Sequence, residues 1–181
     1  MNHFFQRQKR ASGRGRRAGF VSIEVIIVLV VVIVLAGIAM SKSDILTNNS
    51  AANEEIGNIQ AIVTASKNLK TTAGYGTAGT DLTSQLLTQG DLPKNISVVG
   101  GVMQNPSGGT YVVLSTGGGF TVATSNLPAK LCSKTVPKLS KYQAFSNTSV
   151  NGTANAGEVT PSAAGTQCGA GGATVTYTVA S

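Results

Sequence analysis

Side chains able to carry acid–base, nucleophilic or metal chemistry are scarce in this 181-residue chain. The one histidine, His3, lies in a basic segment over residues 1–19, and the two cysteines, Cys132 and Cys168, are far apart. Without that segment the chain has no histidine, which excludes a Ser-His-Asp triad, a Cys-His pair and a His-ligated zinc site. No carboxylates have the spacing of a calcium loop or form an evident acid–base pair. We therefore expect no catalytic site, no metal, no cofactor and no enzyme activity.

Positive charge is concentrated at the N-terminus. Six of the 14 lysine and arginine residues lie in residues 1–19, and all seven acidic residues lie after them. A uniformly basic surface of the kind that binds nucleic acid is therefore not predicted for the rest of the chain. A later group of lysines recurs at helical spacing and predicts either a solvated helix face or a contact with an acidic partner, such as DNA or a neighbouring subunit. These lysines are Lys130, Lys134, Lys138 and Lys141.

One carboxylate, Glu24, stands beside a long apolar segment. Residues 25–40 read VIIVLVVVIVLAGIAM and contain no charge. Counted from Phe20, the segment would form a helix of about 31 Å, which is long enough to cross a bilayer. A carboxylate at the edge of such a span is costly and marks a functional residue that needs a partner. The basic residues before it place residues 1–19 in the cytoplasm and the rest of the chain outside.

Two interpretations of this N-terminal region remain open on these features alone. A secretory signal peptide also has a basic region followed by an apolar core, and Gly37 and Ala39 form a small-x-small cleavage site. The pair Arg16-Arg17 adds a weak twin-arginine pattern. The second interpretation rests on the hexapeptide GFVSIE, residues 19–24, which joins the basic leader directly to the apolar run. This combination resembles the class III signal of type IV prepilins.

The prepilin resemblance implies a defined role for three residues. In that family a membrane peptidase cuts immediately after the glycine, and the amine of the new first residue is methylated. The resemblance therefore implies cleavage between Gly19 and Phe20 and N-methylation of Phe20. It also implies that Glu24 pairs with the Phe20 amine of a neighbouring subunit and so sets the axial register of a filament. Such pairing removes most of the cost of burying either charge.

The pattern after the leader predicts an α+β fold. No proline occurs before Pro93, which predicts one long helix over residues 20–72. Its first half is apolar on every side, whereas its second half has one apolar stripe that should pack on a globular head. The stripe contains Ile45, Ala52, Ile56, Ile59, Ile62, Val63 and Leu69, and the polar residues between its members are Glu54, Glu55, Asn58, Lys67 and Lys70.

The head, residues 73–181, is predicted to contain an antiparallel sheet. We expect a short helix over 81–89 and a second helix over 127–142 that Pro137 interrupts. The composition of residues 146–172 predicts a long loop with little core. The expected strands cover residues 96–103, 110–116, 120–124 and 174–179, of which the second and third form a hairpin and the last lies inside the sheet.

Cys132 and Cys168 are expected to form a disulfide, because this part of the chain is predicted to lie outside the cytoplasm. Two free thiols or a redox site are the alternatives, although the CxxC spacing is absent. A C-terminal disulfide that bounds a variable, exposed loop is characteristic of type IV pilins. The resemblance implies that role for residues 132–168.

Short motifs in the head are similar to those of type IVb pilins, most closely the thin-pilus pilins of conjugative elements. They are Ser41-Lys42, the Gly-Tyr-Gly of residues 74–76 and the Leu-Pro-Lys-Asn of residues 92–95. Phe20 as the first mature residue is more typical of the type IVa class. The resemblance covers essentially the whole chain and implies the type IV pilin fold.

The sequence is thus identified as a type IV pilin-like subunit with a leader (1–19), a long helix (20–72, with 20–40 in the membrane or the filament core) and a head (73–181). The resemblance implies a major pilin that polymerises with copies of itself after prepilin peptidase has acted, with the help of pilus assembly machinery. It would lie in the inner membrane as a prepilin and then in an extracellular filament of a Gram-negative bacterium. There it would contact a host or recipient-cell receptor in adhesion, aggregation or conjugation, with no nucleic acid required.

Three alternatives to a major pilin remain open. The chain could be a minor pilin or a pseudopilin of a type II secretion machine. It could also be a soluble secreted binding domain that signal peptidase releases near Ala39.

Overall fold

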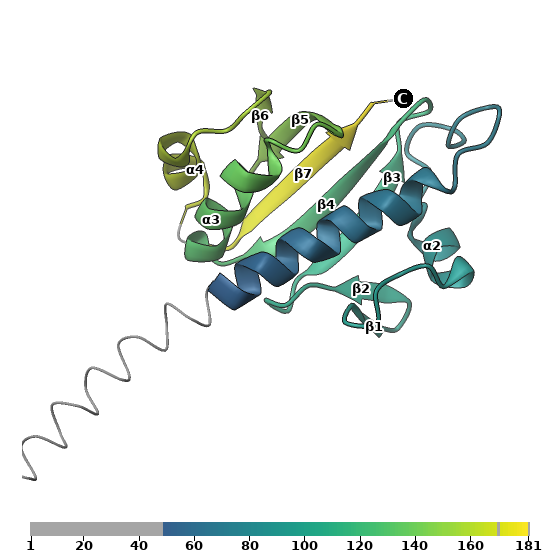
Figure 1. Ribbon diagram of the computed structural model, residues 1–181, viewed down its shortest axis with the longest axis horizontal. Coiled ribbons are helices and arrows are strands. Elements are labelled where there is room, and N and C mark those ends of the chain that lie inside the picture. The colour runs from purple at the N-terminus through teal and green to yellow at the C-terminus, as the bar shows by residue number, and fades with distance from the viewer. Residues whose placement is uncertain (1–48, 170, 181) are drawn as a thin grey trace, which may run out of the picture. The chain divides into compact units, whose positions relative to one another are not determined.

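The computed structural model describes residues 49–169 and 171–180, which belong to a unit spanning residues 43–181. They form a seven-stranded antiparallel sheet with the strand order β1-β2-β3-β4-β7-β5-β6. A helix over residues 49–67 and helix α3 (Ala129–Leu139) lie over the same face of this sheet (Figure 1). The predicted cleavage signal, apolar run and Glu24 lie outside the described residues. Within the described ranges, no helix combines the length and apolarity needed to cross a membrane.

The 49–67 helix packs on the sheet through the predicted apolar stripe. Ala52, Ile59, Ile62 and Val63 are at most 1% exposed, which confirms the stripe in this part of the chain. The helix ends at residue 67 and not at residue 72. The backbone N–H groups of the next residues bond three residues back instead of four, which tightens and ends the helix.

Four strands form one half of the sheet. They are β1 (Ser97–Val99), β2 (Val102–Gln104), β3 (Thr110–Ser115) and β4 (Phe120–Leu127), and the predicted β3–β4 hairpin is confirmed. The single strand predicted over 96–103 is wrong, because Gly100 and Gly101 form a turn with φ angles of 60° and 80°. Two residues with positive φ fit a tight hairpin, so the segment pairs with itself as β1 and β2.

Helices α2 (Thr83–Gln89) and α3 (Ala129–Leu139) flank the 49–67 helix on either side (Figure 1). Helix α2 begins two residues later than predicted, because Asp81 Oδ1 accepts a hydrogen bond from the Thr83 backbone N–H at 2.8 Å. Helix α3 continues through Pro137, contrary to the predicted interruption. Pro137 is buried and lies in the last turn. The one backbone hydrogen bond that a proline cannot donate there does not end the helix.

The long loop predicted over 146–172 is wrong. This region contains β5 (Phe145–Val150), β6 (Thr153–Ala156) and α4 (Pro161–Gln167). The β5–β6 turn is Asn151-Gly152, with φ angles of 48° and 83°, the residue pair that favours a two-residue hairpin. Strand β7 (Ala173–Val179) lies between β4 and β5, which confirms its predicted place inside the sheet.

Candidate functional site

The predicted disulfide is present and joins two helices. Cys132 lies on α3, and Cys168 caps the C-terminus of α4, with 5.7 Å between their Cα atoms. Both residues are buried. The bond encloses β5, β6 and α4, so the segment that it bounds is folded structure and not an irregular loop.

Polar side chains order the enclosed segment, which has few large apolar residues. Asn155 on β6 and Gln167 on α4 exchange two amide hydrogen bonds of 3.0 Å each. In the β5–β6 turn, Asn151 Nδ2 donates to the Gln167 backbone oxygen, and Asn151 Oδ1 accepts from the Thr174 N–H, both at 2.9 Å. These bonds connect β6, the turn and α4 to the start of β7.

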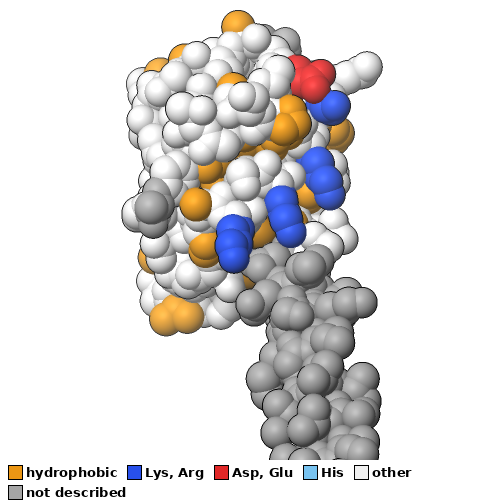
Figure 2. All heavy atoms as spheres, turned by 90° about the vertical axis from the view of Figure 1, so that its left-hand side faces the viewer, with side chains coloured by type: hydrophobic (Ala, Val, Ile, Leu, Met, Phe, Trp, Pro, Cys, Tyr) orange, Lys and Arg blue, Asp and Glu red, His pale blue; other side chains and the backbone are white. Residues whose placement is uncertain are grey.

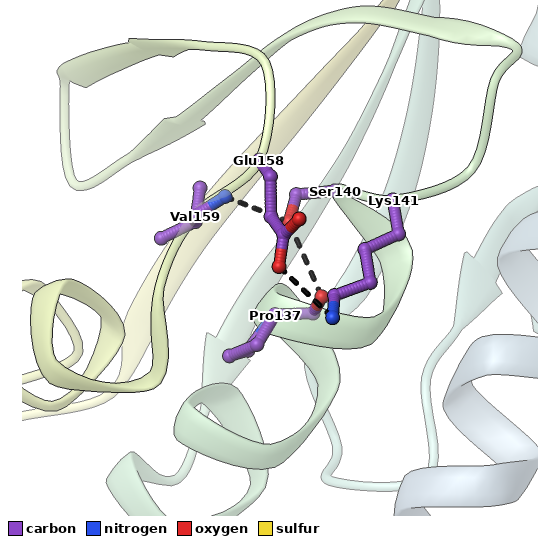
Figure 3. Close-up of polar contacts among 5 residues, drawn as sticks. All are labelled: Pro137, Ser140, Lys141, Glu158 and Val159. Carbon is purple, nitrogen blue, oxygen red and sulfur yellow. Dashed lines mark hydrogen bonds and ion pairs between the residues drawn. The ribbon is translucent and has the colours of Figure 1, made fainter.

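A second polar contact joins the end of α3 to the segment before α4 (Figure 3). The Ser140 hydroxyl accepts from the Val159 backbone N–H at 2.9 Å and donates to the Pro137 carbonyl at 3.3 Å. Beside it, Lys141 and Glu158 form an ion pair at 2.9 Å with both side chains more than half exposed. The buried serine contributes more to the stability of the head than the exposed ion pair does, because surface ion pairs in water add little to the free energy of unfolding.

The other half of the sheet meets the 49–67 helix through a buried carboxylate. The Glu55 side chain is fully buried, and its two oxygens accept hydrogen bonds from Tyr111 Oη at 2.6 Å and Thr124 Oγ1 at 2.9 Å. Tyr111 and Thr124 are directly opposite each other in the β3–β4 ladder. One carboxylate therefore joins the helix to two adjacent strands.

The hydrogen bonds of Glu55 extend to the loops around the sheet. Asn58 Nδ2 donates to Tyr111 Oη at 3.4 Å, and Asn95 Nδ2 donates to Asn58 Oδ1 at 2.6 Å. On the other side, Asn105 Nδ2 donates to Thr124 Oγ1 at 3.1 Å. We call this set the Glu55 network; it consists of Glu55, Asn58, Asn95, Asn105, Tyr111 and Thr124.

Burial controls the ionisation of the Glu55 network. Desolvation raises the pKa of Glu55, the hydrogen bonds from Tyr111 and Thr124 oppose that shift, and the charge of nearby Glu54 adds to it. Desolvation and the adjacent Glu55 charge raise the pKa of Tyr111 far above its ordinary value. Tyr111 is therefore a neutral hydrogen-bond donor at all ordinary pH values.

The predicted polar side of the helix needs correction at two positions. Glu55 is fully buried and Asn58 is 2% exposed, whereas Glu54 is exposed as expected. Sequence spacing contains a signal for this, because residues 55 and 58 lie one turn before the apolar Ile59 and Ile62 on the same stripe. Their polar side chains nevertheless indicated an exposed position, since Glu is almost never fully buried without partners.

The residues that the structure describes contain no cluster of three or more His, Cys, Asp or Glu side chains that could bind a metal. What this arrangement does is structural: it attaches a sheet and a disulfide-bounded segment to one helix.

Comparison with known families identifies the fold. Residues 49–180 match the family model described as PilS N terminal. The chain belongs to the PilS family of type IV pilins. The fold is also similar to the crystal structure of a type IVb pilin from Salmonella typhi, with a TM-score of 0.61 and 23% sequence identity over 70% of this chain and 98% of that chain. Comparison with curated protein sequences gives no significant match.

Membership of this family establishes the general function of the chain. Pilins are structural subunits of extracellular filaments that polymerise with copies of themselves, so this chain is a structural protein and not an enzyme. The expected type IV pilin fold is confirmed by the likeness of the described residues to that crystal structure. The disulfide of this pilin is the expected pair, whereas the Glu55 network was not predicted.

The four lysines of this pilin lie together as their spacing predicts. Lys130, Lys134 and Lys138 lie on α3, and Lys141 follows its last turn. Lys134 is half-buried, whereas the other three are exposed. Their side chains form a row on one face of the molecule (Figure 2).

Proposed function

We propose that this pilin is the major subunit of a type IV pilus of a Gram-negative bacterium. Prepilin peptidase cleaves it after Gly19, the amine of Phe20 is methylated, and pilus assembly machinery polymerises it through its apolar N-terminal helix. Before assembly the chain resides in the inner membrane with residues 20–40 as the span. The observation that carries this proposal is the family match over residues 49–180. These residues follow, further along the same chain, a basic leader, a glycine, Glu24 and an apolar run in the order of a prepilin.

Glu24 has a specific role in this proposal. In a filament, the apolar helices leave the bilayer and pack against identical helices, where an unpaired carboxylate would be costly. The Phe20 amine of the neighbouring subunit supplies the opposite charge. A Glu24→Gln variant should still be cleaved after Gly19, but it should assemble poorly, because only correct axial register brings the two charges together.

The completed filament serves contact between cells. Adhesion to a host, aggregation and conjugative contact with a recipient cell are the roles that fit an extracellular pilus, and each requires a receptor on the other surface. No nucleic acid is needed for any of them.

Intact mass and N-terminal sequence of protein from sheared surface filaments test this function. We expect a dominant chain that begins at Phe20, with one added methyl group and two hydrogens fewer for the Cys132–Cys168 bond. A processed chain present only in trace amounts would instead identify a minor pilin or a pseudopilin. A soluble chain that begins near Met40 would contradict the pilin pathway.

A further inference from the structure

A row of lysine side chains borders a groove beside α3 (Figure 2). The lysine row is defined as Lys130, Lys134, Lys138 and Lys141. Lys130, Lys134 and Lys138 follow one another after four residues, which spaces them about 6 Å apart along the helix, and Lys141 comes three residues later. Like charges at this spacing repel one another and destabilise a helix. Repulsion within the row therefore lowers the stability of the isolated head, and an anionic partner would relieve that repulsion.

Little within the described head neutralises the lysine row. Lys141 pairs with Glu158, and Lys134 Nζ donates to the neutral amide oxygen of Asn49 at 2.9 Å. Among residues 49–169 and 171–180, no ion pair involves Lys130 or Lys138. Neighbouring cations without nearby carboxylates attract anions from solution.

The adjoining groove offers three kinds of contact. It has a volume of about 460 Å³, within the range of small-ligand sites. Lys134, Lys138 and Lys141 supply ammonium groups along it. Neutral polar groups come from Ser133 and Asn49, and apolar ring surface comes from the exposed Pro161.

Two polymeric partners fit this combination less well than a sugar chain does. A second copy of the chain offers no acidic row among its described residues, because its exposed carboxylates are at least ten residues apart and one of them already pairs with a lysine. These carboxylates are Glu54, Asp81, Asp91 and Glu158. For nucleic acid, no arginine occurs in the described ranges to make bidentate contacts. The adjacent Tyr142 packs edge-on against Phe145, with ring centroids 5.4 Å apart, so it is not a free stacking platform.

We propose that the lysine row and its groove bind an acidic oligosaccharide, a sugar chain that bears carboxylate or phosphate groups. The ammonium groups contact the acid groups, while Ser133 and Asn49 hydrogen-bond sugar hydroxyls. Pro161 contacts the C–H face of a ring. A duplex of DNA would use only the first of these contacts, which separates the two ligands experimentally.

Binding of oligogalacturonate to the full chain in mild detergent tests the proposal, measured by calorimetry at physiological salt. The same oligomer with methyl-esterified carboxylates serves as the uncharged ligand. We expect the combined variant Lys134→Gln, Lys138→Gln and Lys141→Gln to lose about ten-fold or more in affinity. The matched control, Lys67→Gln, Lys70→Gln and Lys94→Gln, removes the same charge elsewhere and should stay within about two-fold.

A variant that fills the groove without changing the charge distinguishes binding in the groove from binding by positive charge alone. Ser133→Tyr should weaken oligogalacturonate binding while leaving the weaker binding of a short DNA duplex unchanged. Near-UV circular dichroism verifies that each variant is folded. Equal binding of the esterified oligomer, equal loss in the control variant, or tighter binding of DNA that Ser133→Tyr does not affect would each overturn the proposal. Neither leader cleavage nor filament assembly enters this test.

Discussion

The two halves of the sheet are joined to the helical layer in different ways. Strands β3 and β4 meet the 49–67 helix through the Glu55 network and large buried side chains, among them Tyr111, Phe120 and Val122. Strands β5 and β6 and helix α4 bury fewer apolar side chains, mainly Phe145, Val150 and Ala164, and a disulfide joins this segment to α3. A segment rich in Ser, Thr, Asn and Gly cannot bury enough apolar surface to stay ordered without help. The comparison teaches that a covalent bond and amide pairs can supplement a small core.

The largest expected effect comes from removing the disulfide. Its partners are 36 residues apart, and a closed loop of that length contributes about 4 kcal/mol on the chain-entropy model. We expect the Cys132→Ala, Cys168→Ala variant to lose about that much free energy of unfolding, measured by urea denaturation of the full chain in detergent. Wild-type protein under reducing conditions is the control and should behave alike. Full stability in both would contradict the account.

Removal of the buried carboxylate should cost nearly as much in the other half. Glu55→Ala leaves the Tyr111 and Thr124 hydroxyls without their acceptor, and each buried unpaired group costs about 1–3 kcal/mol. We expect a net loss of about 2–4 kcal/mol, because removing the carboxylate also relieves its own desolvation. Glu54→Ala changes the adjacent exposed carboxylate and should shift stability by no more than about 0.5 kcal/mol. Equal effects of the two substitutions would show that the Glu55 network does not stabilise the head.

A smaller effect should appear in the pH dependence of stability. The pKa of Glu55 is raised in the folded chain above its ordinary value of 4.5, so folding favours the protonated form. This contribution is fully present below the ordinary pKa and is lost as pH rises through the raised pKa. Glu55→Gln resembles the protonated acid and should lack this dependence.

Urea titrations of wild type and Glu55→Gln across acidic and neutral pH measure that difference. Wild type should lose stability relative to the variant as pH rises. A difference that stays constant with pH, or one that grows in favour of wild type, is incompatible with the raised pKa.

The smallest expected effect concerns the Lys141–Glu158 ion pair. Both partners are more than half exposed, so water and salt screen their attraction. Lys141→Gln should change the free energy of unfolding by less than about 1 kcal/mol. Ser140→Ala, one residue away, removes the buried acceptor of the Val159 N–H and should cost more. The reverse order in urea denaturation would contradict this assignment.

Much of the first half could be predicted from the sequence, because its signals are local. The alternation of strands β3 and β4 and the apolar spacing of Ile59 and Ile62 are visible within short windows, as is the alternation of β7 between the halves. The burial of Glu55 could not be predicted, since its partners Tyr111 and Thr124 lie 56 and 69 residues away. Only the folded chain shows that two hydroxyls meet one carboxylate.

The loop predicted for the second half is wrong because the order of this segment depends on strand pairing and not on composition. The sequence of β5, FSNTSV, is mostly polar, yet it pairs with both β7 and β6. Asn155 and Gln167 are typical loop residues until their amides face each other. The Asn151-Gly152 turn was the one local signal that could have indicated a hairpin.

Hydrogen exchange of the full chain, read by mass spectrometry, tests the difference between the halves most directly. We expect the Cys132→Ala, Cys168→Ala variant to lose amide protection in β5, β6 and α4 while β3 and β4 remain protected. Glu55→Ala should show the opposite pattern, with faster exchange in the 49–67 helix, β3 and β4. The same uniform loss of protection in both variants would contradict the claim that two distinct attachments stabilise this head.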